Sequence, residues 1–183
     1  SPIAWNYRGA VHLAKDDRKQ ARASWERALE LAPGYFAAAS NLALLDLDER
    51  QPAAAEARFQ GVLKADPKHT RALLALASLK RSRGDTAGFL KLVETARAAK
   101  PQAIDPPLLL VRHYLERREA SRALAVARAA LDSHPGHPAA LEALANAQLL
   151  SGEKDNALSS FRKLVSANDD KSAARLKLAA AQI

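Results

Sequence analysis

Four prolines divide the chain at a constant interval. Pro33, Pro67, Pro101 and Pro135 lie 34 residues apart, and each follows a stretch in which apolar residues recur at helical spacing. Because proline cannot continue a helix, each of them predicts the end of a helical segment. A fixed interval of this length is typical of chains built from repeated structural units. The sequence therefore predicts an array of repeats.

Small and bulky side chains recur on the same interval. Ala21 precedes Trp25 by four positions, and Ala55 precedes Phe59 in the same way one repeat later. A small residue lets two helix backbones approach, and the bulky residue fills the space beside it. Aromatic residues make up only 5% of the chain, while Ala and Leu dominate its 48% hydrophobic content. This composition favours an all-α fold.

Each repeat is expected to contain two helices joined by a turn. The first helices are predicted near residues 2–15, 36–49, 70–83, 106–117 and 138–151, and the second helices near 18–31, 52–65, 86–99, 120–132 and 154–167. The predicted turns carry residues that tolerate the left-handed conformation or cap the next helix, at Asp16-Asp17, Gly84-Asp85 and Gly152-Glu153. The third repeat has Phe89 at a small-residue position, and Pro106-Pro107 delay the next helix, so we expect a local distortion between the third and fourth repeats.

The first repeat resembles the tetratricopeptide-repeat (TPR) family, whose pattern runs W-x2-L-G-x2-Y, then A-x3-F, then P. The matching residues are Trp5, Gly9, Ala21, Trp25, Ala28 and Pro33, while His12 replaces the tyrosine and is interpreted as a buried core residue. The resemblance covers essentially the whole chain. It implies an all-α fold, a TPR α-solenoid in which helix-turn-helix repeats form a right-handed superhelix.

The repeat boundaries predicted on this basis describe a single array over residues 1–183. The repeats are expected at about 1–34, 35–68, 69–102, 103–136 and 137–170, with a partial sixth repeat at 171–183. Residues 172–183 look like a first helix with no second helix and no polar outer face. Because repeat arrays need polar terminal units, the chain is interpreted as a piece of a longer array.

Motifs for catalysis, cofactors and metals are absent from the sequence. The chain has no cysteine, which excludes cysteine nucleophiles and disulfides, and it has no phosphate-loop, dinucleotide-binding or His-Glu-x-x-His motif. His134 and His137 lie three residues apart, but without a third ligand they indicate an exposed turn. The sequence therefore predicts no catalytic residue, no cofactor and no metal site.

The TPR resemblance implies a concave groove lined by the first helices, with the second helices on the convex back. The candidate groove residues are the positions of the first helices that face away from the contact within a repeat: Asn6, Asn41, Arg71, Ser78, Arg81, Arg112, Glu142, Asn146 and Lys177. The net charge is +8, and residues 69–102 carry seven Lys or Arg residues against two acidic ones. Arg71, Arg81 and Arg112 therefore predict a basic stripe and an acidic partner.

Two partner classes are disfavoured. Chaperone-binding TPR domains hold a terminal carboxylate with a clamp of Lys, Asn and Arg, and here only Asn41 and Arg71 match, because Asn6, Ala10 and Ala75 occupy the other clamp positions. Nucleic acid is also disfavoured, because the aromatic residues stand mainly at core positions and leave only Tyr7 and Tyr35 to stack on bases. A protein or peptide and an acidic polysaccharide are the partners that the sequence leaves open.

Four segments resemble a narrower group, the PEP-CTERM system TPR-repeat lipoprotein. They are residues 41–47 (NLALLDL), 57–68 (ARFQGVLKADPK), 108–115 (LLLVRHYL) and 157–165 (ALSSFRKLV). That family is bacterial and is associated with exopolysaccharide production and protein sorting in Gram-negative envelopes. The resemblance implies a non-catalytic scaffold that is periplasmic or anchored to the outer membrane through a segment beyond this sequence. The alternative is a cytosolic adaptor that binds a peptide or helix of a partner protein.

Overall fold

The computed structural model describes residues 1–167, and all regular structure in that range is α-helical, without a strand. The helices are α1 (Pro2–Ala14), α2 (Arg18–Leu31), α3 (Phe36–Asp48), α4 (Pro52–Ala65), α5 (Thr70–Ser82), α6 (Thr86–Ala99), α7 (Asp105–Glu116), α8 (Ala120–Ser133), α9 (Pro138–Leu150) and α10 (Lys154–Ala167). The predicted helices are confirmed, with ends that differ by one residue at most. The predicted sixth repeat lies outside the described residues. None of the described helices has the length and apolar character needed to cross a membrane.

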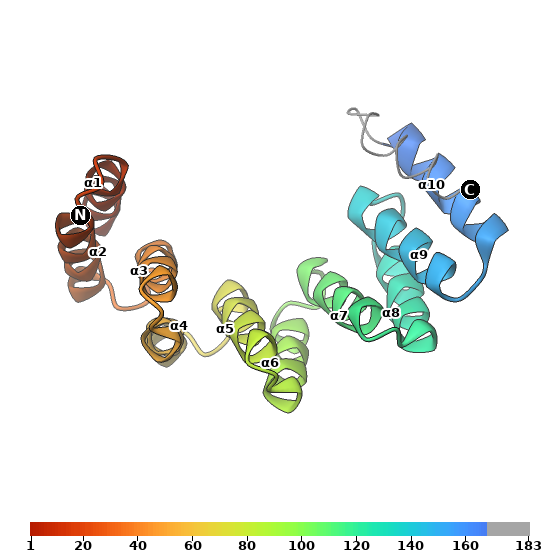
Figure 1. Cartoon of the computed structure of the whole chain (residues 1–183), viewed down its shortest axis with the longest axis horizontal. Helices are drawn as coiled ribbons and strands as arrows, with labels where there is room; N and C mark the ends of the chain where they lie inside the picture. The colour runs from red at the N-terminus through yellow and green to blue at the C-terminus, as the bar shows by residue number, and fades with distance from the viewer. Residues whose placement is uncertain (168–183) are drawn as a thin grey trace. The chain divides into compact units, whose positions relative to one another are not determined.

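Each odd-numbered helix packs beside the even-numbered helix that follows it, as Figure 1 shows. The helix pairs fall into two compact units, one of residues 1–100 with α1 to α6 and one that begins at Pro101 with α7 to α10. The boundary coincides with the position where the sequence predicts a local distortion. Beyond it, α7 carries Pro106 and Pro107 in its first turn, where a missing backbone N–H costs no helical hydrogen bond. The single array over 1–183 stays a prediction.

A close contact between glycine and tryptophan joins α1 to α2. Trp25 is 1% exposed, and its Nε1 donates a hydrogen bond to the carbonyl oxygen of Asn6 at 3.1 Å. A Cβ placed on Gly9 would lie 2.6 Å from Cδ1 and 2.7 Å from Cε2 of the Trp25 ring. Position 9 therefore has no room for any side chain, which confirms the small-residue site predicted from the repeat.

In the third repeat, a large and a smaller side chain exchange positions, and the packing is preserved. Phe89 stands where Ala21 stands in the first repeat, and Val93 stands where Trp25 stands. Both Phe89 and Val93 are fully buried. A larger side chain at one site is thus compensated by a smaller one at the other, which keeps the volume between the helices nearly constant.

The turns inside the repeats share one left-handed residue. It recurs every 34 residues and is Asp16, Arg50, Gly84, Arg118 or Gly152, with φ between 57° and 81°. Asp17 and Asp85 follow it as helix caps, and their carboxylates accept hydrogen bonds from the backbone N–H groups of Gln20 and Gly88. The predicted turns are confirmed, and the two arginines adopt the same conformation without the freedom of glycine.

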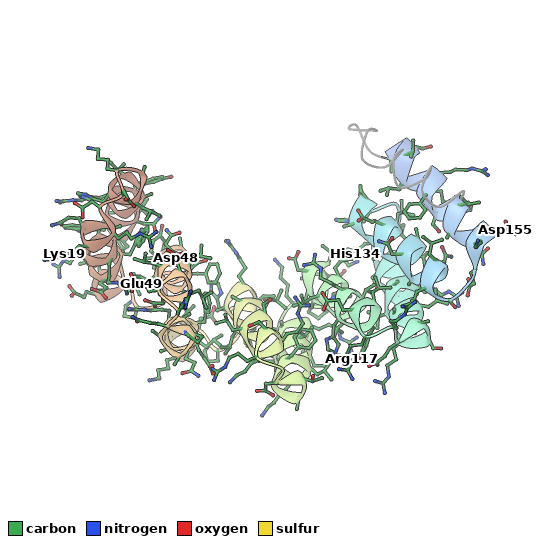
Figure 2. All side chains as sticks on the ribbon, viewed as in Figure 1. Lys19, Asp48, Glu49, Arg117, His134 and Asp155 are labelled. Atoms are coloured by element: carbon green, nitrogen blue, oxygen red, sulfur yellow. The ribbon has the colours of Figure 1, made fainter. Side chains whose placement is uncertain are left out.

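The repeat position of His12 carries polar residues that bind neighbouring helices. Asp46 of α3 is fully buried, and it accepts hydrogen bonds from Arg22 of α2 at 2.6 Å and from Arg58 of α4 at 3.0 Å. Partial burial lowers the pKa of Arg22, but its hydrogen bonds to Asp46 and Glu49 outweigh this and raise the pKa above its ordinary value. Asp48 at the end of α3 pairs with Arg18 of α2, and Glu49, the next residue, pairs with Arg22 of α2. Figure 2 labels both acidic residues.

His12 itself is only half-buried. Its side chain is 24% exposed, and its Nδ1 lies 3.8 Å from a carboxylate oxygen of Asp17. Arg8 donates a weak hydrogen bond of 3.4 Å to its other ring nitrogen. The interpretation of His12 as a buried core residue is therefore correct only in part, because about a quarter of its side chain is exposed.

We expect Gly9→Ala to destabilise the chain by about 1–3 kcal/mol, because the new methyl group must displace the Trp25 ring. The measurement is the free energy of unfolding in urea. Gly61→Ala is the matched control: it lies inside α4 with no atom within 4 Å of an added Cβ, and it should stabilise the chain by about 0.5–1 kcal/mol. Equal effects of the two variants would contradict the proposed contact.

Asp46→Asn should cost about 3 kcal/mol of unfolding free energy, because it leaves two partly buried guanidinium groups without their shared carboxylate. Asp48→Asn, two residues away on the same helix, removes an exposed ion pair with Arg18 and should cost less than about 1 kcal/mol. Both values can be measured by chemical denaturation. Equal losses of unfolding free energy in the two variants would contradict the stabilising role of the ion-pair network around Asp46.

Candidate partner-binding groove

An open cavity of about 280 Å³ lies between α7 and α9 in the second unit. Its apolar floor and its polar side chains come from two successive first helices. The lining residues are Leu108, Val111, Arg112, Leu115, Ala139, Glu142, Ala143 and Asn146. The structure thus brings together three of the residues predicted to face a partner, namely Arg112, Glu142 and Asn146.

The core of the unit determines which side chains reach this groove. On α7, Val111 is 1% exposed and packs against Ala123 and Ala127 of α8. Arg112, the next residue on α7, is exposed and lines the cavity. On α9, Glu142 and Asn146 are four residues apart and therefore share one helix face.

The groove combines an apolar floor with both signs of charge. Leu108 and Leu115 offer apolar surface, Arg112 offers a guanidinium, and Glu142 offers a carboxylate. The amide of Asn146 can both donate and accept a hydrogen bond. This set of groups suits a polypeptide segment, which presents apolar side chains, charged side chains and backbone amides at once.

In the first unit, Asn6 of α1 and Asn41 of α3 lie together. Asn41 donates a side-chain hydrogen bond of 2.9 Å to the amide oxygen of Asn6. Arg71 of α5 is exposed and lies over the ring of Phe36 with 4.6 Å between the guanidinium carbon and the ring centroid. The hydroxyl of Ser78 donates to the Leu74 carbonyl of its own helix at 3.0 Å.

Much of the basic charge in residues 69–102 is engaged in ion pairs. Lys80 and Arg83 both contact Glu56 of α4, at 2.6 Å and 3.1 Å, and Arg97 contacts Glu94 at 3.1 Å. Arg81 is half-buried on α5. The basic stripe of Arg71, Arg81 and Arg112 draws on both units and stays a prediction, and Lys177 lies outside the described residues.

The histidine pair at positions 134 and 137 forms a structured turn. Both ring nitrogens of His134 face carbonyl oxygens, with Nδ1 3.1 Å from Ala130 and Nε2 3.0 Å from Gln102. The two imidazole centroids are 6.2 Å apart. The expected exposed turn is found only at Pro135 and Gly136, because both histidines are half-buried. Across residues 1–167, no cluster of three or more His, Asp or Glu side chains is arranged to hold a metal ion.

Three apolar side chains on the first helices are exposed although they are not among the predicted groove residues, and the sequence singles out only Tyr7 of them, as a residue that could stack on a base. Ile3, Tyr7 and Leu44 are 55%, 69% and 64% exposed. The repeat interval could have found them. Tyr7 precedes Asn41 by one repeat of 34 residues, and Leu44 precedes Ser78 by the same distance.

Three segments of the chain match models described as Tetratricopeptide repeat, at residues 2–35, 46–112 and 108–181. Together these matches take in most of the 183 residues. The chain belongs to the tetratricopeptide-repeat family. Its all-α fold is a TPR solenoid, and TPR solenoids serve as scaffolds for protein interactions. No curated protein matches the sequence.

Solved TPR proteins share this fold at low sequence identity. A thermophilic TPR protein of Thermus thermophilus is 21% identical, with a TM-score of 0.72 over 100% of this chain and 99% of that one. PilW, a widely conserved type IV pilus biogenesis factor, is 21% identical, with a TM-score of 0.70 over 99% of this chain and 86% of that one. YrrB, a TPR protein with an unusual peptide-binding site, is 15% identical, with a TM-score of 0.61 over 97% of this chain and 91% of that one.

Proposed function

We propose that this TPR protein is a non-catalytic scaffold that binds a segment of a partner protein in the groove between α7 and α9. The observation that carries the proposal is the cavity of about 280 Å³, in which Arg112, Glu142 and Asn146 surround an apolar floor. YrrB, which shares the fold, is described as having an unusual peptide-binding site. A protein or peptide partner agrees with that description.

The charges in the groove favour a polypeptide over an acidic polysaccharide. A polyanion is bound best by a run of cations, but here the carboxylate of Glu142 lines the same cavity as Arg112. Lys80 and Arg83 of the third repeat share the carboxylate of Glu56, which belongs to α4 of the second repeat. An acidic segment of a protein needs fewer cations than a charged glycan does, and it also offers apolar side chains to the floor.

We place this scaffold in a bacterial envelope export or exopolysaccharide system, in the periplasm or at the outer membrane. The support for this setting is the resemblance of residues 41–47, 57–68, 108–115 and 157–165 to the PEP-CTERM system TPR-repeat lipoprotein. PilW, which shares the fold, is described as a type IV pilus biogenesis factor. The alternative setting is the cytosol, where the same groove would serve an adaptor for a peptide or helix.

Arg112→Glu should weaken a groove-bound peptide by about tenfold, because it places a second carboxylate beside Glu142. The probes are linear peptides selected from a random phage-displayed library on the 183-residue chain and titrated by fluorescence anisotropy. The matched control is Arg162→Glu, an exposed arginine of α10 outside the groove, which should leave the affinity within about twofold.

Polygalacturonate, titrated at low and at high salt, tests the polysaccharide alternative on the same variants. Its tight binding at low salt and loss in Arg112→Glu, with no peptide enriched from the library, would contradict the proposed function. Peptide binding that is equal in wild type and Arg112→Glu would contradict the assignment of the groove.

The cellular setting predicts which extract contains the partner. The wild-type chain, immobilised and incubated with periplasmic and cytosolic extracts of a Gram-negative bacterium that encodes it, should retain a protein from the periplasmic extract that the Arg112→Glu chain does not retain. Quantitative mass spectrometry of both eluates measures this difference. A groove-dependent partner found only in the cytosolic extract would support the adaptor instead.

A further inference from the structure

His134 joins two segments of the second unit that lie far apart in the sequence. It is the C-cap residue of α8, and its Nε2 lies 3.0 Å from the carbonyl oxygen of Gln102, in the turn that precedes α7. Its Nδ1 lies 3.1 Å from the carbonyl oxygen of Ala130, in the last turn of α8. Figure 2 labels the histidine. The imidazole therefore bridges the end of α8 to the segment that leads into α7.

Both ring nitrogens of His134 face atoms that only accept hydrogen bonds. A neutral imidazole carries one N–H, so it can donate to one carbonyl oxygen, while its other nitrogen places a lone pair against the second oxygen. The protonated ring carries two N–H groups and can donate to both oxygens. The C-terminal end of α8, whose last turn holds no basic residue, also favours a cation at this place. The geometry is therefore complementary to the imidazolium.

The charged surroundings of His134 include both signs. The imidazole of His137, at the N-cap of α9, lies 6.2 Å away between ring centroids. The charged groups of the adjoining segments are Asp132 of α8, Asp105 of α7, Lys163 of α10, which shares a cavity with Asp132, and Lys100, two residues before Gln102. Within residues 1–167, the ring of His134 forms no ion pair with a carboxylate. The two carbonyl oxygens are thus the direct contacts that distinguish the charged ring from the neutral one.

The first turn of α7 has few hydrogen bonds of its own. Pro106 and Pro107 lack a backbone N–H, and the N-cap residue Ile104 provides no side-chain hydrogen bond. The backbone N–H of Leu108 reaches the carbonyl oxygen of Ile104 at 3.3 Å, which is long for such a bond. The contact between the imidazole and the preceding turn therefore restrains a segment that the backbone of α7 holds weakly.

The bridge is an addition to the repeat and is not required by it. The equivalent C-cap residues of the earlier repeats are Ala32, Asp66 and Lys100, and all of them share the extended φ of His134, between −149° and −136°. Ala32 has no polar side chain, and Asp66 accepts a hydrogen bond from the backbone N–H of Lys68 within its own connection. The fold thus accepts unrelated side chains here, so replacing His134 should leave the helices intact.

We propose that His134 is a pH-sensitive clamp of the second unit. Its imidazolium joins α8 to the turn before α7, and deprotonation between about pH 5 and 8, where histidine titrates, removes one of the two bonds. The clamp is complete at the acidic end of this range and is lost as the pH rises. Leu108 in the first turn of α7 lines the groove, so one wall of the groove is best ordered in mildly acidic surroundings. The clamp works whichever partner binds the groove, and so it goes beyond the proposed function.

Amide hydrogen exchange of Leu108, measured by NMR on the 183-residue chain without a partner, tests the clamp. Its protection factor, corrected for the intrinsic effect of pH on exchange, should fall about tenfold from about pH 5.5 to about pH 8. In His134→Gln this fall should disappear, because glutamine does not titrate. His137→Gln is the matched control: it removes the neighbouring imidazole and should keep the pH dependence of the wild type.

Ring protonation can be followed in the wild-type chain itself. Long-range ¹H–¹⁵N spectra report the protonation of each imidazole nitrogen, and the signals of His134 are those that are missing in His134→Gln. The pH at which this ring loses its proton should match the pH at which the Leu108 amide loses protection. This comparison needs no substitution in the protein that is measured.

Three outcomes would overturn the clamp. They are a constant protection factor of Leu108 across this pH range, an unchanged pH dependence in His134→Gln, and a protection that follows the ring of His137 instead. No peptide is present in these measurements. Their failure would therefore leave the proposed function intact, and failure of the peptide selection would leave the clamp intact.

Discussion

The close contact between a first helix and its second helix is the constraint on which the rest of the structure depends. Gly9 leaves just enough space for the Trp25 ring, and Ala21 is fully buried beside it. When one side of a first helix is buried against its second helix, the opposite side is available for other contacts. The groove between α7 and α9 is formed by such opposite sides. The candidate groove and the core therefore follow from one periodic pattern.

Ion pairs between successive repeats favour one order of helix pairing. Between α2 and α3 the cation comes from the second helix and the anion from the first helix, as Arg22 binds Asp46. Between α4 and α5 the polarity is reversed, because Glu56 of the second helix binds Lys80 of the first. Two helices paired out of order would bring like charges together at these sites. The alternation therefore favours the native order of repeats over a shifted one.

The helices could be predicted closely because proline and the spacing of small residues act locally. The exchange at Phe89 and Val93 shows the limit of that reasoning. Phe89 indicates a distortion when it is considered alone, yet Val93 compensates for its size. Arg50 and Arg118 likewise adopt the left-handed turn conformation because the repeat imposes it, although their own preference opposes it.

Only the polar residues of the candidate surfaces could be recognised from the sequence. Arg112, Glu142 and Asn146 are polar residues at repeat positions that face away from the core, and the structure brings them to one cavity. Ile3 and Leu44 occupy the same kind of position, but apolar residues in a helical pattern are normally interpreted as core. Only their exposure, which depends on the packing of neighbouring helices, distinguishes them. The pairing of Lys80 and Arg83 with Glu56 also depends on tertiary structure, so net charge alone overstated the basic character of the third repeat.

The central claim is that tight pairing of helices leaves one face of each first helix free to bind a partner. Backbone amide NMR of the isotope-labelled chain, recorded while a selected peptide is added, tests it most directly. The account predicts chemical-shift changes along α7 and α9, with α8 and α10 little affected. Changes concentrated on those second helices would contradict it.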